Sequence, residues 1–302
     1  MHQTLALVFN PVAGRGEFTS NLFEVVDRLT RGGFLVTAYP TAAAHDAYNF
    51  VRRHARDCDY LLCAGGDGTF NEVLDAVMQC GSRPVLGCIP AGSTNDFAVS
   101  LGLPRDILHA VDVVINGKRQ FIDVGLFGKD HFAYAAAFGL FTDVSYTTPQ
   151  GMKNLLGHAA YMLESVRRLA SIQTYSCQIW LDGEKVEGDF ILGMVTNSRS
   201  VGGFRFPDSL PIVLDDGQFE VMLVRRPRRF AHLQEIVSAL LGVVSSFDGI
   251  LIRHASSVRI VSETPLQWTL DGEYGGNTND IVLQNLPRAL QVMAPLSDPL
   301  VL

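Results

Sequence analysis

A pattern repeated over about the first 115 residues constrains the fold of this chain more than any other feature of its sequence. Each repeat consists of a short apolar run, a loop of small residues and an amphipathic helical segment. Short apolar runs predict buried strands, and apolar side chains at three- and four-residue spacing predict helices that pack on one face. Strands that alternate with helices form a parallel, doubly wound α/β sheet, whose ligand site lies at the carboxyl ends of the strands. The strands expected are Leu5–Phe9, Phe34–Tyr39, Tyr60–Ala64 and Val85–Ile89.

After about residue 120 the pattern changes to β-rich segments separated by turn residues. This succession predicts an antiparallel β-sandwich as a second domain. We expect an α/β domain over 1–120, the sandwich over 121–288, and a C-terminal segment, 289–302, that is free to return to the first domain. Helices are expected near Leu155–Leu169 and Leu233–Val244. The strands expected here are Tyr175–Leu181, Phe190–Asn197, Phe219–Val224, Val258–Val261, Leu266–Leu270 and Ala289–Ala294.

Composition and charge narrow the class of protein. Of the 302 residues, 47% are hydrophobic and 18% are charged, which suits a buried core and excludes disorder. The net charge of -7 gives no general attraction to nucleic acid, so we expect no nucleic-acid partner. One basic run, Arg225–Arg229, is either a solvated loop or a patch for anionic lipid headgroups.

Cysteine usage and the lack of targeting segments predict a cytoplasmic protein. The five cysteines form no C-x-x-C pair and have no histidine at metal-binding spacing, as is typical of reduced thiols. The first ten residues lack the basic flank and apolar stretch of a signal peptide. No segment has about 18 uninterrupted apolar residues, so any membrane contact is expected to be peripheral.

The loop Gly65-Gly66-Asp67-Gly68-Thr69 joins the third expected strand to a helix. Backbone N–H groups at such a place favour a phosphate, and glycines let the main chain approach it closely. A carboxylate at Asp67 would repel phosphates unless a cation lay between them, which indicates Mg²⁺. Without a ligand, the same string is a glycine turn capped by Asp67 or Thr69, and Thr69 with Glu72 forms a capping-box pattern.

The segment Gly65–Glu72 resembles the GGDGT-x-NE signature of the diacylglycerol kinase catalytic-domain family. The resemblance spans nearly the whole chain, and the chain is most similar to the compact bacterial lipid kinases of the family. Other segments that keep the order of the family are Asn10–Gly14, Gly92–Phe97, Lys153, Leu156–Gly157, Tyr161, Asn197, Gly202–Gly203, Pro207, Asp216–Gly217 and Leu270–Glu273.

The resemblance implies an enzyme that transfers the γ-phosphate of ATP to a lipid hydroxyl, with ATP in the cleft between a nucleotide-binding α/β domain and the sandwich. Asp67 would organise the catalytic Mg²⁺. Glu273 matches the general base, which accepts the proton of the attacking hydroxyl. The residues that would contact the nucleotide are Asn10, Pro11, Gly14, Thr41, Gly65, Gly66, Asp67, Gly68, Thr69, Asn71, Ser93 and Thr94.

The string Leu-Asp-Gly-Glu occurs twice, at Leu181–Glu184 and Leu270–Glu273. Asp-Gly is an ordinary hairpin turn, so either glutamate could be a solvated residue without a role. Spacing alone treats the two copies equally, and only the order of the family motifs favours Glu273.

A second metal is implied by the resemblance alone. The segment Asp215–Gly217 first indicates a turn between strands. In related bacterial enzymes the matching segment holds a structural Mg²⁺, which here would be bound by the Asp216 carboxylate and the main-chain carbonyls of Val213 and Gln218.

Two other functions remain open at this point. An NAD kinase shares the GGDG loop and has an Asn-Asn-Glu string well after it. In this chain Asn95-Asp96-Phe97 stands at the second nucleotide loop instead. A non-catalytic lipid-binding protein could keep the fold, although it would not need Asp67, Asp216 and Glu273 together. The lipid acceptor (diacylglycerol, phosphatidylglycerol or a sphingoid base) and a homodimeric state are also left open by the sequence.

Overall fold

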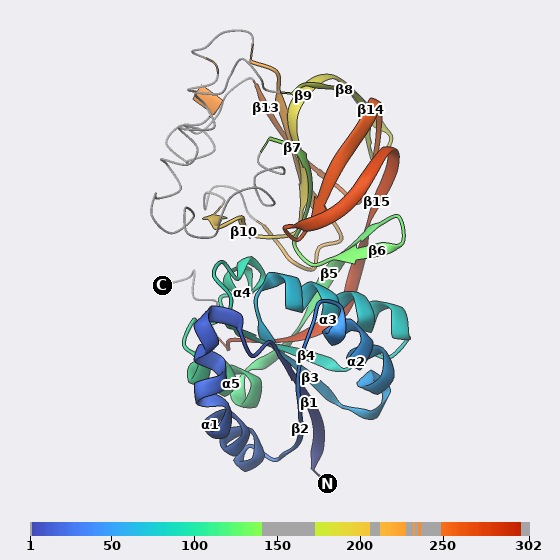
Figure 1. Cartoon of the computed structure of the whole chain (residues 1–302). Coiled ribbons are helices and arrows are strands. Elements are labelled where there is room, and N and C mark those ends of the chain that lie inside the picture. Colours follow the sequence, from blue (N-terminus) through green and yellow to red (C-terminus); the bar gives the residue numbers. More distant parts are fainter. Residues whose placement is uncertain are drawn as a thin grey trace.

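A computed structural model of the chain describes residues 2–140, 173–205, 212–227, 232, 235–236 and 249–296. Figure 1 shows two parts, with an α/β part that contains the N-terminus below a β-rich part. None of the helices in these ranges is long and apolar enough to cross a membrane. All five cysteines are free thiols.

The α/β part is built on four parallel strands. They are β1 (Gln3–Phe9), β2 (Phe34–Pro40), β3 (Tyr60–Gly65) and β4 (Val85–Pro90), and their spatial order is β2-β1-β3-β4. All four strands predicted from the apolar runs are therefore confirmed. The chain reverses its direction of travel across the sheet after β2, so the loops after β1 and β3 lie on either side of a topological switch point, where doubly wound sheets place their ligands.

Helices cover both faces of this sheet. Leu5, Leu7 and Phe9 point to one face and share a core with α1 (Glu17–Arg31) and α5 (Ile107–Asn116). Ala6 and Val8 point to the other face, where they pack with α2 (Asp46–His54) and α3 (Asp67–Cys80). The alternation follows from the two-residue period of a strand. The shorter helical segments are η1 (Ala13–Gly16), η2 (Ala55–Asp57) and α4 (Asp96–Ser100).

The capping-box prediction at Thr69 is wrong. Helix α3 begins at Asp67, directly after β3, and its N-cap is Gly66 without a side-chain cap. Thr69 is already inside the first turn, where its side chain packs so closely on Gly65 that an added Cβ there would lie 2.7 Å away. The Glu72 carboxylate instead accepts hydrogen bonds at the start of α2, from the N–H groups of His45 (2.8 Å) and Tyr48 (3.4 Å).

The β-rich part is an antiparallel β-sandwich. Its interior contains large aromatic side chains with almost no exposed surface, including Phe132, Phe138, Phe190, Phe219 and Trp268. Burying one such side chain contributes roughly 1.5–3 kcal/mol. The strands are β5 (Lys118–Phe127), β6 (Asp130–Phe132), β7 (Ala135–Gly139), β8 (Tyr175–Leu181), β9 (Glu184–Thr196), β10 (Ser200–Val201), β11 (Phe204–Arg205), β12 (Phe219–Arg225), β13 (Ile250–Ala255), β14 (Ser257–Leu270) and β15 (Glu273–Ala294).

Two strands are longer than predicted. The segments expected as Val258–Val261 and Leu266–Leu270 are halves of β14, whose register against β15 shifts between them. The strand expected at Ala289–Ala294 is the end of the 22-residue β15. There Val292 pairs in parallel with Leu86 of β4, so β15 joins the antiparallel strands to the parallel ones.

Some predictions lie beyond the part of the chain that the structure describes. The helix expected near 155–169 lies outside it, and of the helix expected near 233–244 only residues 235 and 236, both helical, are described. The division of the chain at residues 120 and 288 stays a prediction.

Candidate functional site

The loops that follow the four parallel strands meet at the carboxyl edge of the sheet. Backbone hydrogen bonds join them in pairs: Asn10 N–H to the carbonyl of Ala64 (3.0 Å), and Thr41 N–H to the carbonyl of Phe9 (2.9 Å). The N–H of Ala91 donates to the carbonyl of Gly65 at 2.9 Å. The structure thus brings together the loops that carry the predicted nucleotide contacts.

Two glycines allow the main chains of the third and fourth loops to touch. An added Cβ at Gly92 would lie 2.5 Å from the Cα atom of Gly66, so a side chain at either position would force the loops apart. Gly14 has a positive φ of 54°, and a Cβ there would collide with the carbonyl of Ala91. A glycine without a Cβ therefore also lets the first loop lie against the fourth.

Asn95 closes the fourth loop. It adopts a left-handed conformation (φ 58°), and its side chain accepts from the N–H of Gly92 (2.8 Å) and donates to the carbonyl of Gly92 (2.7 Å). This small ring holds Ser93 and Thr94 at the tip. Their hydroxyls form no hydrogen bond to any residue that the structure describes, so both are available to a ligand.

The amino terminus of α3 faces the same space. The first N–H groups of a helix have no partner inside it, and no side chain caps α3. Pro11, Gly66, Gly68 and Thr69 lie in or beside this region and are only partly buried. Free N–H groups together with the helix dipole make such a terminus suited to phosphate.

Asp67 places a carboxyl group at this helix terminus, which is otherwise suited to phosphate. Burial, together with the negative charges of Asp96 and Asp271, raises its pKa to about 7. Its Oδ1 accepts a long hydrogen bond, of 3.3 Å, from the N–H of Phe97, and the backbone of Asn95 is a second donor. A carboxylate with so few donors fits a hard cation such as Mg²⁺, which would bind between it and a ligand's phosphate oxygens. Within the described ranges no three His, Cys, Asp or Glu side chains form a metal cluster.

The turn between β14 and β15 brings Glu273 to the phosphate-binding loop. An added Cβ at Gly68 would lie 3.0 Å from Oε1 of Glu273, which shows that this carboxylate lies directly over the loop. The turn residues Asp271 (φ 50°) and Gly272 (φ 83°) both have positive φ, as in a type I′ hairpin. The buried Asp271 accepts hydrogen bonds from the N–H groups of Ala133, Tyr134 and Ala135.

The second Leu-Asp-Gly-Glu copy forms the same kind of turn elsewhere. Asp182 and Gly183 also have positive φ, and the Asp182 carboxylate accepts hydrogen bonds from Ser256 and Ser257 of the sandwich. No residue of the α/β part is among its partners in the described ranges. The tertiary structure therefore separates two strings that the sequence could not distinguish.

Two residues of the site were missed in the sequence analysis. Asp96 is 1% exposed and accepts hydrogen bonds from the hydroxyl of Ser200 and from the N–H groups of Gly202 and Gly203, so it ties α4 to the sandwich. Tyr134 is buried, and its burial and the nearby Asp67 and Asp271 raise its pKa well above the usual value, so it stays a neutral phenol. Asp96 could have been found from the Asn-Asp-Phe motif, but no sequence signal marks Tyr134.

The predicted second metal site lies in an acidic region. Oδ1 of Asp216 accepts from the N–H of Gln218 (3.0 Å), while Val213 is 43% exposed. Nearby, Asp123 accepts from the N–H of Gly217 (2.7 Å). Among the described residues neither side-chain oxygen of the buried Glu220 has a hydrogen-bond partner, although Nδ1 of His254 lies 3.8 Å from Oε1, and burial together with Asp216 and Asp123 raises its pKa to about 8. The excess of negative charge fits a cation held by one carboxylate and main-chain carbonyls.

Comparison with known proteins agrees with this geometry. Residues 4–127 match the family model described as the diacylglycerol kinase catalytic domain, and residues 138–294 match the YegS C-terminal NAD kinase beta sandwich-like domain. A protein of Bacillus subtilis (strain 168) named diacylglycerol kinase is 36% identical over 293 residues, which are 96% of this chain and 95% of that protein. A Staphylococcus haemolyticus (strain JCSC1435) protein of the same name is 34% identical and covers 98% of this chain and 89% of its own.

Solved structures are also similar. The crystal structure of a candidate diacylglycerol kinase from Bacillus anthracis str. Sterne superimposes with a TM-score of 0.84 at 27% sequence identity, and the match covers 99% of this chain and 97% of that one. Another from the same strain gives a TM-score of 0.83 at 26% identity and covers 99% of each chain.

Proposed function

Because the chain belongs to the diacylglycerol kinase family and is a kinase of that family, we propose that it transfers the γ-phosphate of ATP to the hydroxyl of diacylglycerol or a related membrane lipid. The observation that carries the proposal is the place of Glu273, whose carboxylate lies over Gly68 at the amino terminus of α3. A proton acceptor next to a phosphate-binding helix terminus is the arrangement that phosphoryl transfer to an alcohol needs.

The loops of the α/β part bind the nucleotide in this proposal. Free N–H groups at the start of α3 hold phosphate oxygens, and the hydroxyls of Ser93 and Thr94 donate to the same phosphates. Asn10 and Thr41, whose loops are joined to β3 and β1, hold the nucleoside. Because Gly66 and Gly92 let the loops touch, these donors surround the phosphates closely.

Asp67 holds the metal that accompanies the nucleotide. When bound, Mg²⁺ neutralises charge on the transferred phosphate. A nearby cation also stabilises the ionised form of Asp67, whose pKa burial otherwise raises to about 7. Asp216, with the carbonyls of Val213 and Gln218, holds a second, structural ion away from the phosphate loop.

Glu273 acts as the general base. It accepts the proton of the lipid hydroxyl as that oxygen attacks the γ-phosphate. The buried, neutral phenol of Tyr134 lies close to the turn that carries Glu273, since a Cβ added to Gly272 would be 3.6 Å from its hydroxyl oxygen. Tyr134 thus adds no charge to a site that already contains four carboxyl groups, those of Asp67, Asp96, Asp271 and Glu273.

Peripheral contact with the membrane delivers the lipid. Arg225 ends β12, Arg226 follows it, and the Arg225 guanidinium lies 5.7 Å from the centre of the Phe190 ring. Each basic residue near an anionic surface contributes about 1 kcal/mol to binding. These two described residues of the basic run are therefore suited to lipid headgroups.

A turnover assay tests the proposal. The purified protein is incubated with γ-labelled ATP, Mg²⁺ and micelles that contain diacylglycerol, phosphatidylglycerol or sphingosine, with NAD as a soluble acceptor in parallel. We expect label in a lipid and none in NAD. Label in NAD alone would make the chain an NAD kinase, and tight ATP binding without any turnover would make it a lipid-binding protein.

A further inference from the structure

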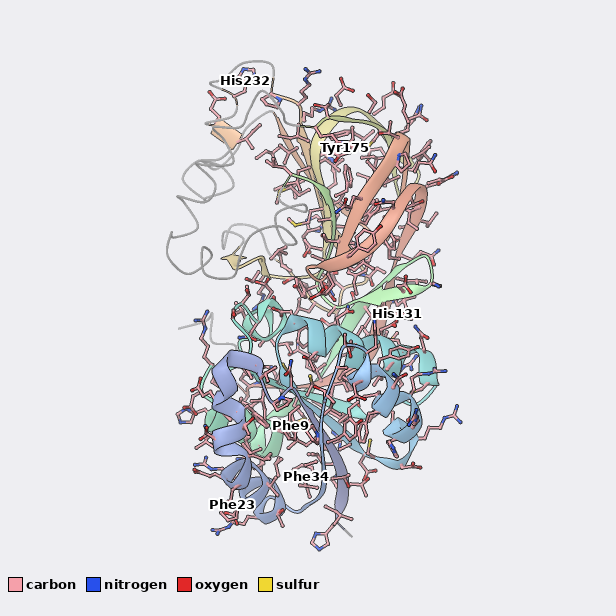
Figure 2. The ribbon with its side chains drawn as sticks, in the orientation of Figure 1. Phe9, Phe23, Phe34, His131, Tyr175 and His232 are labelled. Atoms are coloured by element: carbon pink, nitrogen blue, oxygen red, sulfur yellow. The ribbon has the colours of Figure 1, made fainter. Side chains whose placement is uncertain are left out.

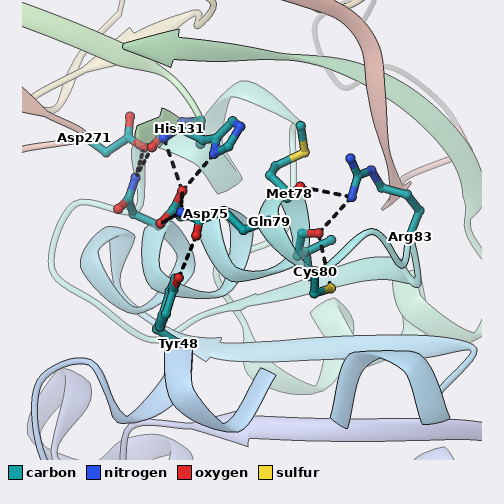
Figure 3. Close-up of polar contacts among 11 residues, drawn as sticks. Tyr48, Asp75, Met78, Gln79, Cys80, Arg83, His131 and Asp271 are labelled. Carbon is teal, nitrogen blue, oxygen red and sulfur yellow. Dashed lines mark hydrogen bonds and ion pairs between the residues drawn. The ribbon is translucent and has the colours of Figure 1, made fainter. Parts of the chain in front are cut away.

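Two side chains on one face of α3 form hydrogen bonds to the sandwich. Asn71 and Asp75 are four residues apart, so they lie one above the other on the helix. Asp75 Oδ1 binds Nδ1 of His131 (2.8 Å) and the N–H of His131 (3.2 Å), while Asn71 reaches the neighbouring turn at Asp271 (Figure 3). His131 lies where the two parts of the chain meet (Figure 2). The helix that follows the phosphate loop is thus bound to two hairpins of the sandwich.

The amide group of Asn71 is fully used by these contacts. Its Nδ2 donates to Oδ2 of Asp271 at 2.7 Å and to the carbonyl of His131 at 3.3 Å. An amide nitrogen has two protons, so no donor is left for a nucleotide. The remaining Oδ1 is an acceptor and cannot bind a phosphate oxygen directly. The predicted contact of Asn71 with the nucleotide would therefore have to use the acceptor Oδ1 and not the amide protons.

The position of Glu273 depends on the position of Asp271, which lies two residues before it in the same turn. Asp271 is 3% exposed, and it accepts hydrogen bonds from the N–H groups of Ala133 (2.6 Å), Tyr134 (2.9 Å) and Ala135 (3.0 Å) besides the amide of Asn71. The first three donors belong to the sandwich itself. Asn71 is the member of this set that comes from the α/β part, so it alone among these four ties the turn to the phosphate loop.

From these contacts we propose that Asn71 is a positioning residue for Glu273, which holds the Asp271–Gly272 turn on α3 and so fixes the base over Gly68. The inference rests on the proposed function, in which Glu273 is the base and Gly68 belongs to the phosphate loop. Only Gly272 separates Asp271 from Glu273, so a shift of Asp271 is passed on to the base almost unchanged. A displacement of about 1 Å in a reacting pair can cost about 10²-fold in rate.

The variant Asn71→Ala tests this role. It removes the two hydrogen bonds of Asn71 to the sandwich, to Asp271 and to the carbonyl of His131, and leaves the three backbone bonds to Asp271 in place, so the sandwich should still fold. We expect kcat to fall by about 10²-fold, while KM for Mg·ATP changes by less than about threefold, because an interaction lost only in the transition state lowers kcat. If Asn71 were a nucleotide ligand, KM and the dissociation constant for ATP would rise instead, with kcat nearly unchanged.

Asp182→Asn is the matched control. Asp182 occupies the same position in the second Leu-Asp-Gly-Glu turn and accepts three hydrogen bonds, but its partners, Ser256 and Ser257, lie away from α3. It should lower the melting temperature and leave kcat and KM as they are. An equal loss of kcat in Asp182→Asn and Asn71→Ala would show that any weakened hairpin turn harms turnover, and would overturn the proposal.

Hydrogen exchange tests, without any measurement of turnover, whether Asn71 fixes the Asp271–Gly272 turn. In Asn71→Ala the amides of Ala133, Tyr134 and Ala135 should exchange faster than in the wild type, because Asp271 has lost one of its anchors. Unchanged exchange would overturn the proposal even if the enzyme were active. A wild-type protein that phosphorylates no lipid would defeat the proposed function alone, since the exchange comparison would still decide whether Asn71 fixes the turn.

Discussion

The carboxylate of Asp96 in α4 accepts a 2.6 Å hydrogen bond from the hydroxyl of Ser200 in the sandwich, and both side chains are almost completely buried. Two more donors, the N–H groups of Gly202 and Gly203, complete the shell of Asp96. This contact and the Asn71–Asp271 pair are two separate ties between the phosphate-binding loops and the sandwich. Two buried carboxylates thus join the parts of the chain: Asp96 accepts backbone N–H groups across the junction, and Asp271 accepts the side-chain amide of Asn71 across it.

Asp96→Ala should lower the free energy of unfolding by about 2–3 kcal/mol, because it leaves the buried hydroxyl of Ser200 without an acceptor and removes the charged acceptor of the N–H groups of the exposed Gly202 and Gly203. Ser200→Ala removes only one donor and should cost about 1 kcal/mol. Denaturant unfolding monitored by circular dichroism measures both. Equal effects would mean that the backbone donors find other acceptors.

Glu273→Gln should reduce lipid phosphorylation by about 10²–10⁴-fold, since a positioned base contributes that much to the rate. Affinity for Mg·ATP should be kept, because the substitution preserves the shape of the side chain. Glu184→Gln, in the second copy of the turn, is the control and should keep full activity. Loss of activity in Glu184→Gln and not in Glu273→Gln would reverse the assignment of the base.

Alanine at two glycines should separate nucleotide binding from catalysis. At Gly92 an added Cβ would lie 2.5 Å from the Cα of Gly66, so Gly92→Ala forces the third and fourth loops apart and should weaken ATP binding by more than tenfold. At Gly68 the contact would be 3.0 Å to Oε1 of Glu273, a movable side-chain end. Gly68→Ala should therefore lower kcat and nearly keep the ATP affinity. Calorimetric titration measures the ATP affinity, and steady-state kinetics measures kcat. If both variants lost ATP affinity to the same extent, the result would contradict the geometry.

Glu220 should make the metal-free protein less stable as the pH rises. Burial raises its pKa in the folded state to about 8 from an ordinary 4.5, so the folded chain holds this proton more tightly than the unfolded chain. The stabilisation is fully present below about pH 4.5 and is lost between about pH 4.5 and 8. Melting temperatures in chelator should fall over that range less steeply in Glu220→Gln than in the wild type. The exposed Glu184→Gln should follow the wild type, and identical slopes in all three proteins would exclude the effect.

Much of the fold could be predicted from local patterns. The four parallel strands follow from apolar runs whose neighbours along the chain form the covering helices, so the information lies within a few residues. The division of β14 into two predicted strands failed because Ser262–Pro265 interrupts the apolar pattern while the backbone continues through a register shift. The assignment of Glu72 failed for a related reason, because a capping box assumes a local partner and the residue binds α2.

The sequence by itself determined that a glycine-rich loop with one carboxylate follows a buried strand, a pattern that predicts phosphate and a cation there. Tertiary structure alone decided which Leu-Asp-Gly-Glu copy reaches that loop, and that the Asn71 amide serves Asp271, 200 positions further along the chain. The physical reason is the separation along the chain between the residues that interact. Strand and helix patterns are set by near neighbours, whereas a contact between distant segments depends on how β15 pairs with β14, β5 and β4 and so carries its turn to the edge of the other domain.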